Sequence, residues 1–537
     1  MGPRFVPFAL AVLVSVVGEA VSAETTFVSQ SGAERCEFSE RLRPSSVVEI
    51  QNIVKKARDN GQKVKAVGTR HSSSDINCAG GIALDLSNIA SIKVDPKKMR
   101  ATVGAGATHE TMLNALQEQG YSVIHPSMKF SGLSIGGTLA TGAHGSSLVH
   151  PASISDQVVS LTLVDGQGRV RKITGEKLKA VNVNIGVLGV VVTVTIKIVK
   201  NYKVKLEYVD NDESILFDGR AIEWARNQDY LEMSWFPSTK KVVALRGTYV
   251  DINTPGDGKV LAPLTITPET VALLEQASAA RDNAFFCGAE AAARNVLAFG
   301  KNGTPQSFNS KGEYSSSITG VVKDVLSSFC AAGTCAWDNP GPKFLLYAME
   351  FAFDLETLPR ALQAVRNIID KRRWCAVSSE AIQIRFQRKT DNYISFSNGR
   401  DAGIVTTIVP LRQKENSSHY GTSALQEIHH TMLLEFKGRP HWGKNARATF
   451  ADPFPTVSEI YPEWNKFIGV KEELDPEGVF ENDFFRRLTR QQELPKFKYC
   501  AVKDKCVCSE SSHCADGQFC EPLVIGGRDV GVCVDSF

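Results

Sequence analysis

A short apolar strand that runs into a glycine and a histidine among hydroxyl side chains is the most restrictive feature of this sequence. It spans residues 64–75 and reads Val-Lys-Ala-Val-Gly-Thr-Arg-His-Ser-Ser-Ser-Asp. Gly68 allows the backbone to approach a bulky ligand. The hydroxyls of Thr69 and Ser72 and the N–H groups of such a turn suit phosphate oxygens. His71 is the group that can bond covalently to a bound molecule. The alternative is an ordinary turn with a solvated histidine.

Two further glycine-rich stretches follow. Residues 135–147 contain four glycines with interleaved hydroxyls, a pattern that lets backbone N–H groups converge on an anion. Residues 185–190 hold two more glycines directly before an apolar strand. Each stretch alone is weak evidence, because glycine pairs also mark tight packing. Residues 104–106 lack the third glycine of a Rossmann fingerprint, so we reject that interpretation.

Hydrophobic periodicity predicts an α+β unit over about residues 36–202. Ser46-Val-Val-Glu49 is a capping box that opens a helix ending at Asn60-Gly61, and a second helix is expected at Thr108–Gln119. Strands are expected at Lys63–Val67, Val158–Val164, Val170–Ile173 and Val190–Ile198.

The middle of the chain, about residues 203–420, predicts a second α+β domain because strand-like and helical patterns mix there. Its strands are expected at Lys343–Phe353, Ala381–Gln387 and Gly403–Pro410. Its helices are expected at Glu269–Ala280 and Leu358–Lys371, followed by an amphipathic helix at Ser423–Phe436. His429 and His430 on that last helix are neighbours, so they cannot face one metal as an i, i+4 pair would; a structural or solvated role is expected.

The N-terminus resembles a secretory signal. Arg4 precedes a short apolar core, Phe5–Gly18, and Val21-Ser22-Ala23 matches a small-residue cleavage site. The apolar run is too short to predict a membrane span, and no later segment is long enough. We therefore expect a secreted, soluble protein without a membrane partner. Asn302 and Asn416 are glycosylation acceptors.

Cysteine usage fits that compartment. Six of the 12 cysteines lie in the last 38 residues, without a pair of Cys-x-x-Cys knuckles. Three disulfides, with the pairing left open, are therefore expected rather than zinc. The other six are also even in number, so no free thiol nucleophile is predicted. No other metal site and no serine triad is visible. The 61 basic and 58 acidic residues nearly balance, which argues against a nucleic-acid partner.

In order, these motifs resemble one family. Gly68-Thr-Arg-His71-Ser, Gly136-Gly-Thr-Leu-Ala-Thr-Gly-Ala-His-Gly and Gly186-Val-Leu-Gly-Val are similar to the PCMH-type FAD-binding domain of the vanillyl-alcohol-oxidase superfamily. His441-Trp-Gly-Lys444 resembles the His-Trp-x-Lys signature of its sugar-lactone and alditol oxidases, and Asp475-Pro-Glu-Gly-Val-Phe resembles the segment after it. With the signal peptide and the cysteine-rich tail, the whole resembles the plant L-gulonolactone oxidases.

The resemblance implies an FAD cofactor, attached covalently through His71. It implies an α+β fold with a two-subdomain FAD-binding domain at residues 24–202, a substrate (cap) domain at 203–495 and a disulfide-rich tail at 496–537, after a signal at 1–23. The residues expected to bind the cofactor are Val67, Gly68, Thr69, Arg70, His71, Ser72, Gly136, Gly137, Thr141, Gly142, His144, Gly145, Ser146, Gly186, Gly189, Val192 and Lys444.

The same resemblance implies four catalytic residues: Gln383, Arg385, His441 and Lys444. The lysine of the signature lies near flavin N1 in relatives, where a cation would stabilise the reduced, anionic ring. The family's Glu-x-Arg pair reads Gln383-Ile-Arg385 here, so its carboxylate is missing. Glutamine accepts a hydrogen bond but not a proton. Either His441 or another group is then the base, or the substrate differs from the familiar lactone.

The implied function is a secreted FAD-dependent oxidase of the C2 hydroxyl of a sugar-1,4-lactone. L-Gulono-1,4-lactone would give ascorbate through the 2-keto lactone, and oxygen would be reduced to hydrogen peroxide. The alternatives are an oxidase or dehydrogenase of an alditol, a galactonolactone or a specialised metabolite, and a non-catalytic secreted flavoprotein scaffold. Oxidase and dehydrogenase activity are left undecided, because the loop Pro126–Ser131 does not align unambiguously. The exact substrate and the oligomeric state are also left open.

Overall fold

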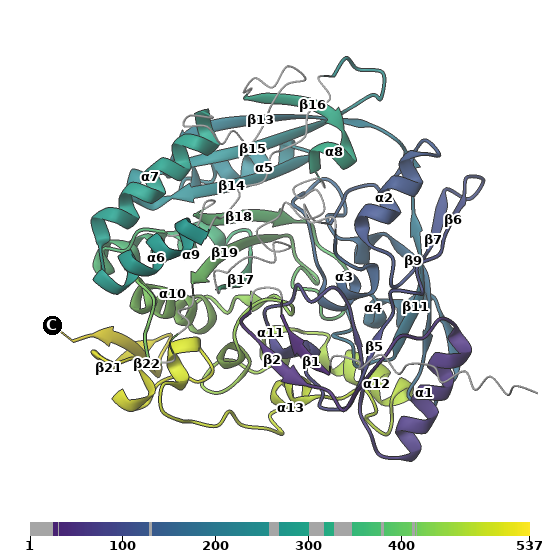
Figure 1. The fold of residues 1–537 in the computed structure, drawn as a ribbon. Coiled ribbons are helices and arrows are strands. Elements are labelled where there is room, and N and C mark those ends of the chain that lie inside the picture. Colours follow the sequence, from purple (N-terminus) through teal and green to yellow (C-terminus); the bar gives the residue numbers. More distant parts are fainter. Residues whose placement is uncertain are drawn as a thin grey trace, which may run out of the picture.

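The computed structural model of this chain describes residues 25–29, 32–127, 132–256, 268–299, 316–326, 346–376, 381–410, 414 and 416–536. The expected signal peptide, Asn302, Cys330, Cys335 and residues 128–131 lie outside them. Figure 1 shows two adjoining lobes, the purple and blue N-terminal part on one side and the teal and green middle part on the other. The yellow C-terminal hairpin lies beside the second lobe, away from the first.

The first lobe begins with a small parallel sheet. Its strands are β3 (Glu40–Leu42), β5 (Ile82–Asp85) and β4 (Val64–Val67), with β5 in the middle. The intervening helix, α1 (Val47–Asp59), buries Ile50, Val54 and Ala57. The Ser46 hydroxyl accepts a hydrogen bond from the Glu49 N–H, as the capping box predicts. The short strands β1 (Thr26–Val28) and β2 (Arg35–Glu37) pair beside this sheet. The Cys36–Cys78 disulfide ties β2 to the segment before β5.

The second half of this lobe is an antiparallel sheet of order β10-β9-β11-β7-β6. Its strands are β6 (Ile92–Asp95), β7 (Arg100–Gly104), β9 (Val158–Val164), β10 (Val170–Ile173) and β11 (Val190–Lys197). The predicted strands at 158–164 and 170–173 are therefore confirmed. Helices α2 (His109–Gln117), α3 (Ile135–Thr141) and α4 (Leu178–Val181) pack on it, and β8 (Tyr121–Ser122) pairs with β12 (Val199–Lys200). Helix α3 forms within the glycine-rich stretch, where no helix was predicted, and ends at left-handed Gly142.

The second lobe is built on an antiparallel sheet of order β16-β13-β15-β14-β18-β19-β17-β20. Its strands are β13 (Lys203–Asp212), β14 (Tyr230–Phe236), β15 (Lys241–Val250), β16 (Ser317–Val321), β17 (Leu346–Asp354), β18 (Ile382–Gln387), β19 (Ala402–Pro410) and β20 (Arg439–Pro440). Its helices are α5 (Arg220–Asn227), α6 (Pro268–Ala280), α7 (Asn283–Phe299), α8 (Val322–Leu326), α9 (Leu358–Arg372) and α10 (Thr422–Leu434). The helices α6, α7, α9 and α10 gather on one side of this sheet (Figure 1).

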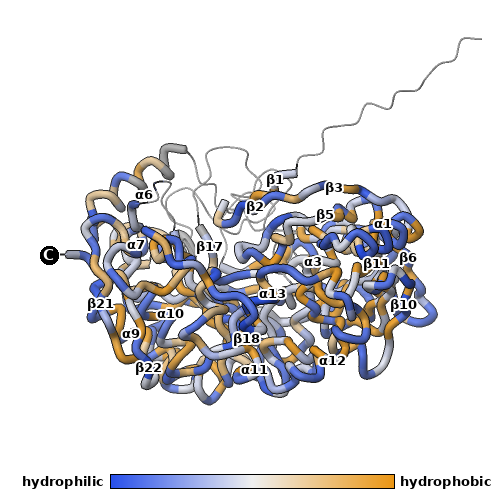
Figure 2. The backbone as a smooth tube through the Cα atoms, turned by 90° about the horizontal axis from the view of Figure 1, so that it is seen from below, coloured by the Kyte–Doolittle hydropathy of each residue, from blue (hydrophilic) through white to orange (hydrophobic). Residues whose placement is uncertain are grey.

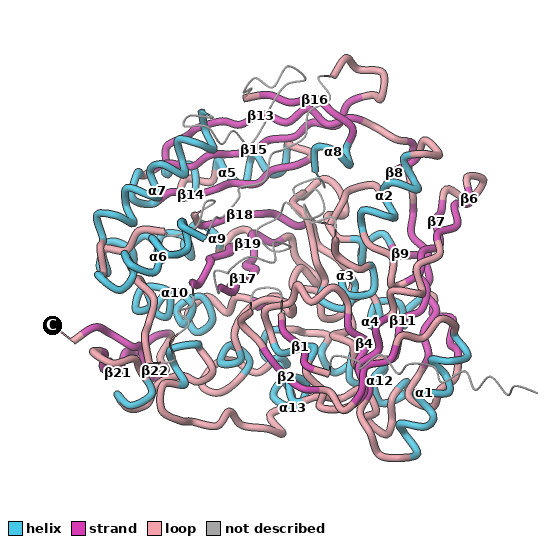
Figure 3. The backbone as a smooth tube through the Cα atoms, in the orientation of Figure 1, coloured by secondary structure: helices cyan, strands magenta, loops and turns pink. Residues whose placement is uncertain are grey.

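Alternation along the strands assigns the two faces of this sheet. Met233, Ile384 and Val405 join the core that includes α9 and α10. The intervening residues of the same strands point to the opposite face, because successive side chains of a strand alternate. That opposite face meets the first lobe (Figure 3). The polar residues described below lie on it.

Helix α10 differs from its prediction. We expected an apolar face and a polar face, but every residue from Ala424 to Leu434 is buried. The second face is covered by the C-terminal tail, to which Ser423 and Gln426 donate hydrogen bonds. His429 Nε2 lies 2.7 Å from the Thr407 hydroxyl, and burial lowers the pKa of both His429 and His430. Both histidines are structural, and neither is solvated.

The chain returns to the first lobe near its end. Helices α11 (Val457–Ile460), α12 (Trp464–Leu474) and α13 (Asp483–Leu488) contribute to the core of that lobe, and α12 contacts α4. The Val64 N–H donates to the Val479 carbonyl (2.9 Å), which extends the edge of β4. The expected cap boundaries, 203 and 495, stay a prediction, but this segment packs with the FAD-binding part.

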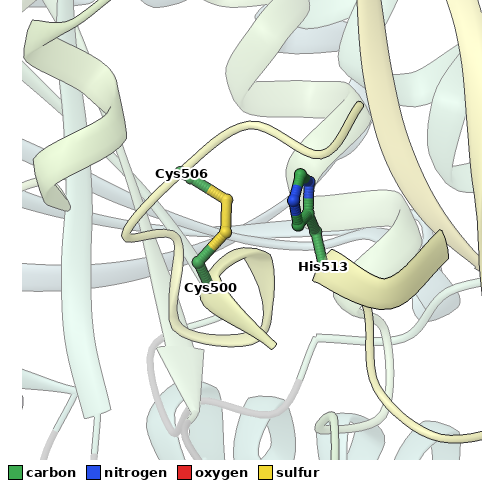
Figure 4. A group of neighbouring side chains, drawn as sticks. All are labelled: Cys500, Cys506 and His513. Carbon is green, nitrogen blue, oxygen red and sulfur yellow. A yellow bond between two sulfur atoms is a disulfide. The ribbon is translucent and has the colours of Figure 1, made fainter. Parts of the chain in front are cut away.

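The cysteine-rich tail folds on three disulfides. They join Cys500 to Cys506, Cys508 to Cys520 and Cys514 to Cys533. Its strands β21 (Gln518–Ile525) and β22 (Arg528–Asp535) form a hairpin that lies beside α9 and α10 in the view from below (Figure 2). His513 lies close to Cys500 and Cys506, whose sulfur atoms are bonded to each other (Figure 4). Because disulfide sulfurs are not thiolates, this cluster is not a zinc site.

The Cys287–Cys375 disulfide links α7 to the end of α9 within the second lobe. Among the described residues, no helix combines the length and apolar character that a bilayer crossing requires.

Candidate active site

A cavity of about 640 Å³ lies between the two lobes. This volume is typical of sites for small molecules and cofactors. The first lobe contributes the end of β4 with the following loop, α3 and residues 184–191. The second lobe contributes β14, β17, β18 and β19 and residues 441–444. Elements that are far apart in the sequence thus form one chamber.

Most of the residues predicted to bind the cofactor line this cavity. They are Val67, Gly68, Thr69, Arg70, His71, Ser72, Gly136, Gly137, Thr141, Gly186, Gly189 and Lys444. Five others are not in the wall, namely Gly142, His144, Gly145, Ser146 and Val192. Gly142 ends α3, Val192 is a core residue, and the Ser146 hydroxyl ties β18 to the first lobe through the Phe386 N–H (3.0 Å). Those five therefore support the wall from behind.

The glycines of the wall lie so close to neighbouring protein atoms that no side chain fits there. A Cβ atom at Gly68 would collide with the Ser134 hydroxyl, and one at Gly136 would come within 3.1 Å of the Ala105 Cβ. Gly189 has a φ of +142°, which few other residues adopt. The exposed backbone here fits close approach of a large planar or phosphorylated ligand.

A buried cation lies in the same wall. Lys65 Nζ donates to the Ile185 carbonyl (2.9 Å), and burial lowers the pKa of Lys65 to about 7. An anionic group in the cavity would favour the charged form of this lysine. The glycine backbone, the hydroxyls and Lys65 together fit the diphosphate of the expected flavin dinucleotide.

The His-Trp-Gly-Lys segment packs directly against the histidine loop. The Ser73 N–H donates to the Gly443 carbonyl (2.9 Å), and the Ser74 hydroxyl donates to the Trp442 carbonyl (2.8 Å). Trp442 is fully buried and stacks on Tyr461, with ring centroids 4.9 Å apart. The tryptophan anchors the turn that presents His441 and Lys444 to the cavity.

Replacement of Gly443 by alanine is expected to reduce flavin occupancy. A Cβ atom there would lie 3.1 Å from Thr141 Cγ2 and 3.2 Å from Ser72 Oγ, so these two side chains have to move by a few tenths of an ångström. Overpacking of this kind costs about 1–3 kcal/mol. The ratio of flavin to protein absorbance after purification measures the effect. Gly469→Ala on α12 is the matched control, because no atom lies within 4 Å of its added Cβ. Full occupancy in Gly443→Ala would contradict the packing argument.

A row of polar side chains crosses the cap sheet at the cavity. Gln383 on β18 pairs with Thr406 on β19, and Thr406 pairs with Glu350 on β17. Side chains directly opposite each other in such a ladder share a face. Arg385 lies on the same face, two residues from Gln383, and its Nη2 lies 3.3 Å from Gln383 Oε1. The predicted pair Gln383 and Arg385 is therefore in the cavity wall.

Glu350 is the centre of this row. Its Oε2 accepts hydrogen bonds from Arg385 Nη2 (2.9 Å), Thr406 Oγ1 (2.6 Å) and Lys444 Nζ (2.5 Å). Its Oε1 lies 3.0 Å from His144 Nε2. Glu350 is only 1% exposed and does not line the cavity. It holds the two cations in place from behind.

The charges of this cluster shift its pKa values. Burial by itself would raise the pKa of Glu350, but Lys444, Arg385 and His144 hold it well below its ordinary value. Burial lowers the pKa of Lys444 to about 8, against the opposing effect of Glu350. Burial also lowers the pKa of His441 well below its usual range, so this imidazole is neutral.

The carboxylate of the Glu-x-Arg motif is absent, as the sequence indicates, and other strands bring acidic side chains to this region. The motif position holds Gln383, but Glu350 on β17 and Glu232 on β14 bring two carboxylates to the same region. Neither residue belongs to one of the motifs described above. The available signal was an acidic residue at the centre of an apolar strand, since Tyr230–Phe236 and residues 347–353 are otherwise largely apolar and buried.

His144, Glu350 and His441 lie close enough together to be considered as metal ligands. However, Glu350 is already paired with Arg385 and Lys444. A further cation would be repelled by both groups. We interpret the cluster as an ion-pair network.

Comparisons with known proteins agree with this arrangement. Residues 40–174 match the family model described as FAD binding domain, and residues 339–488 match D-arabinono-1,4-lactone oxidase. L-gulonolactone oxidase 3 of Arabidopsis thaliana is 25% identical over 525 residues, covering 90% of this chain and 88% of that protein. L-gulono-1,4-lactone dehydrogenase of Mycobacterium tuberculosis (strain ATCC 25618 / H37Rv) is 26% identical over 472 residues, covering 85% and 97%.

Solved structures show the same fold. A solvent-stable cholesterol oxidase superposes with a TM-score of 0.68 at 17% identity, covering 86% of this chain and 97% of that chain. The cholesterol oxidase from B. sterolicum gives a TM-score of 0.66 at 17% identity, covering 86% and 96%. The predicted α+β architecture is confirmed by this likeness.

Proposed function

The chain belongs to the vanillyl-alcohol-oxidase superfamily and is an FAD-dependent oxidoreductase of the sugar-lactone oxidase family; from this premise we propose that it oxidises the C2 hydroxyl of a sugar-1,4-lactone such as L-gulono-1,4-lactone. The product would be the 2-keto lactone, which enolises to ascorbate. A bound FAD would supply the hydride acceptor for this oxidation, and molecular oxygen would take up the electrons as hydrogen peroxide.

One observation carries the proposal. The histidine loop at the end of β4, the turn at 441–444 and the polar row of β18 and β19 open into one cavity. The cavity wall offers N–H donors from Arg385 and Lys444, an acceptor oxygen from Thr406 and an amide from Gln383, a set that suits a small ligand rich in hydroxyl groups. Lys444 would stabilise negative charge that develops on the cofactor.

The proposal is tested with purified protein and a panel of lactones and polyols. L-Gulono-1,4-lactone is expected to bleach the flavin without oxygen, and to give peroxide and ascorbate in air. If a fully flavin-loaded sample is bleached by an alditol or galactonolactone instead, the lactone assignment is wrong. Gln383 motivates this second candidate, because it departs from the family's Glu-x-Arg pair.

Peroxide release in air separates an oxidase from a dehydrogenase. The loop 126–131 lies largely outside the described residues.

We also propose that His71 carries the flavin covalently. The imidazole lines the cavity together with Gly68, Gly136 and Gly137. Its Nε2 lies 4.0 Å from the point where a Cβ atom would stand if Gly132 had a side chain. Histidine is a nucleophile that enzymes use for covalent attachment. A covalent bond would hold the ring in place against the cap strands.

His71→Ala is expected to abolish flavin fluorescence of the protein band on a denaturing gel. The same variant is expected to release its flavin into the supernatant after acid precipitation, because the rest of the cradle is intact. His150→Ala is the matched control, since this partly exposed histidine pairs with Asp229 and does not line the cavity. A fluorescent His71→Ala band would refute the attachment.

Export through the secretory pathway is a further part of the proposal. It is supported by the leader-like residues 1–23 and by five disulfides among the described residues. Asn416 is exposed, as a glycan acceptor has to be. N-terminal sequencing of the mature protein is expected to begin after Ala23. A mature protein that retains Met1 would contradict the proposal.

A further inference from the structure

We propose that Glu232 is the catalytic base of this site, an inference that rests on the proposed oxidation of a carbinol. The Glu232 carboxylate takes the proton of the substrate hydroxyl as the carbinol C–H bond breaks. The electron pair of that bond leaves as hydride to the flavin, and the O–H electron pair forms the carbonyl. The carboxylate becomes a carboxylic acid and returns its proton to solvent after product release.

The register of the cap sheet places Glu232 beside the predicted arginine. Glu232 on β14 is the direct partner of Arg385 on β18, and Ser234 is the partner of Gln383. Directly paired residues of an antiparallel ladder point to the same face, with Cβ atoms about 4.5–5.5 Å apart. Glu232 therefore shares its face with Arg385 and Gln383, one strand further across the sheet. The neighbouring Met233 belongs to the core on the opposite face.

Glu232 lines the cavity, unlike Glu350. It is 6% exposed, and the Tyr230 hydroxyl donates a hydrogen bond of 2.5 Å to its Oε2. That bond fixes the orientation of the carboxylate in the cavity wall. A positioned acceptor in the wall of the cavity is the first requirement for a general base.

Groups of opposite charge surround the Glu232 carboxyl group. Arg385 and Lys444 bring two positive charges, and Glu350 supplies one buried negative charge between them. Glu232 is the second carboxylate, and its charge acts on Lys444, raising the pKa of that lysine. Two cations and two carboxylates leave the cluster near neutrality, so the carboxylate of Glu232 is stabilised by opposite charge.

The other candidates for the base are less suited. Gln383 has no basic group. His441 is neutral, and its Nδ1 accepts the Gly443 N–H (3.1 Å), so its proton lies on Nε2, which then donates rather than accepts. Glu350 is shielded behind Arg385 and Thr406. Asp85, the other carboxylate among the described lining residues, is paired with Arg41 and Arg43 at the end of β5.

The first test is the pH profile of flavin reduction in Glu232→Gln. Without oxygen, the lactone is expected to reduce this variant about 10²-fold more slowly than the wild type, the loss typical of a removed general base. The wild-type rate is expected to rise with pH through the carboxyl titration, and this limb disappears in the variant. Glu290→Gln removes a buried carboxylate that accepts N–H bonds from Ser238 and Ala376 outside the cavity, and it is expected to behave as wild type.

A second test does not depend on turnover. A 2-C-methyl lactone keeps the 2-hydroxyl but has no transferable hydride, and the 2-deoxy lactone lacks that hydroxyl. The wild type is expected to bind the former about tenfold more tightly, as for one hydrogen bond to a charged group. Glu232→Leu is expected to lose this preference while it still binds the 2-deoxy lactone.

The outcomes separate the two proposals. A wild type that is reduced by no lactone of the panel refutes the proposed function. A wild type that is reduced, together with a Glu232→Gln variant that keeps its rate within threefold or retains its acidic limb, refutes the role of Glu232 alone. A hydroxyl preference that survives in Glu232→Leu also refutes that role.

Discussion

Glu350→Ala is expected to lower the stability of the protein by about 3–5 kcal/mol, because it leaves two buried cations without their counter-charge. In the native site, Arg385 and Lys444 both donate to Glu350 Oε2, and the carboxylate is 1% exposed. Thermal unfolding at pH 7, followed by tryptophan fluorescence, measures the loss. Flavin occupancy is expected to fall as well, since Lys444 and Arg385 lose their fixed positions.

The pH dependence of this effect has a definite sign. The folded-state pKa of Glu350 is lowered, so its contribution is fully present above the ordinary carboxyl value of about 4.5 and is lost as pH falls through the lowered value. The difference between wild type and Glu350→Ala is therefore expected to be largest near neutral pH and to shrink in acid.

A double variant controls for simple loss of packing. Glu350→Ala/Lys444→Met removes one stranded cation along with the carboxylate, so it is expected to be destabilised by less than the sum of the single variants. Glu427→Ala breaks the ion pairs to Lys371 and Arg372 outside the cavity, and is expected to leave flavin occupancy unchanged. Strict additivity of the two site variants would show that Glu350 does not hold Lys444 electrostatically.

Lys444→Met is expected to slow anaerobic flavin reduction by about 10²–10³-fold, the loss seen when a preorganised charge-stabilising donor is removed. Methionine keeps the length of the side chain and removes only the cation. Lys444 lines the cavity on a turn that Trp442 anchors in the core, so we expect the loss to lie in the rate rather than in folding. Stopped-flow absorbance of the flavin band measures the rate, and the absorbance ratio reports occupancy.

The lysine also predicts a basic limb in the wild-type pH profile. Burial lowers the pKa of Lys444 to about 8, so its charge is present below that pH and is lost as pH rises through it. The rate of flavin reduction is expected to fall over the same range. Lys444→Arg keeps its charge to higher pH, and is expected to move the limb upward while it recovers part of the rate. An unchanged limb in Lys444→Arg would assign it to another group.

Local structure followed from the sequence wherever the pattern was regular. The alternation in β9, β10 and β11 and the capping serine of α1 depend on neighbouring residues, and those elements form as predicted. Helix α3 was missed, because its glycines interrupt any apolar periodicity. Burial of Ile135 and Leu139 in the core of the first lobe stabilises the helix despite these glycines. Helix α10 gained a second buried face, because a tail that lies 75 to 110 residues further along the chain at its contacts covers it.

By itself, the sequence determined the ordered set of glycine, histidine and His-Trp-Gly-Lys motifs, since each is a contiguous stretch with its own backbone requirements. Only the tertiary structure decided how the charges of the site are balanced. Glu232, Glu350 and Arg385 come from three strands of one sheet, and their proximity depends on strand order and register rather than on spacing along the chain. A substitution at the motif position therefore looked like a lost carboxylate, while the fold supplied two from neighbouring strands.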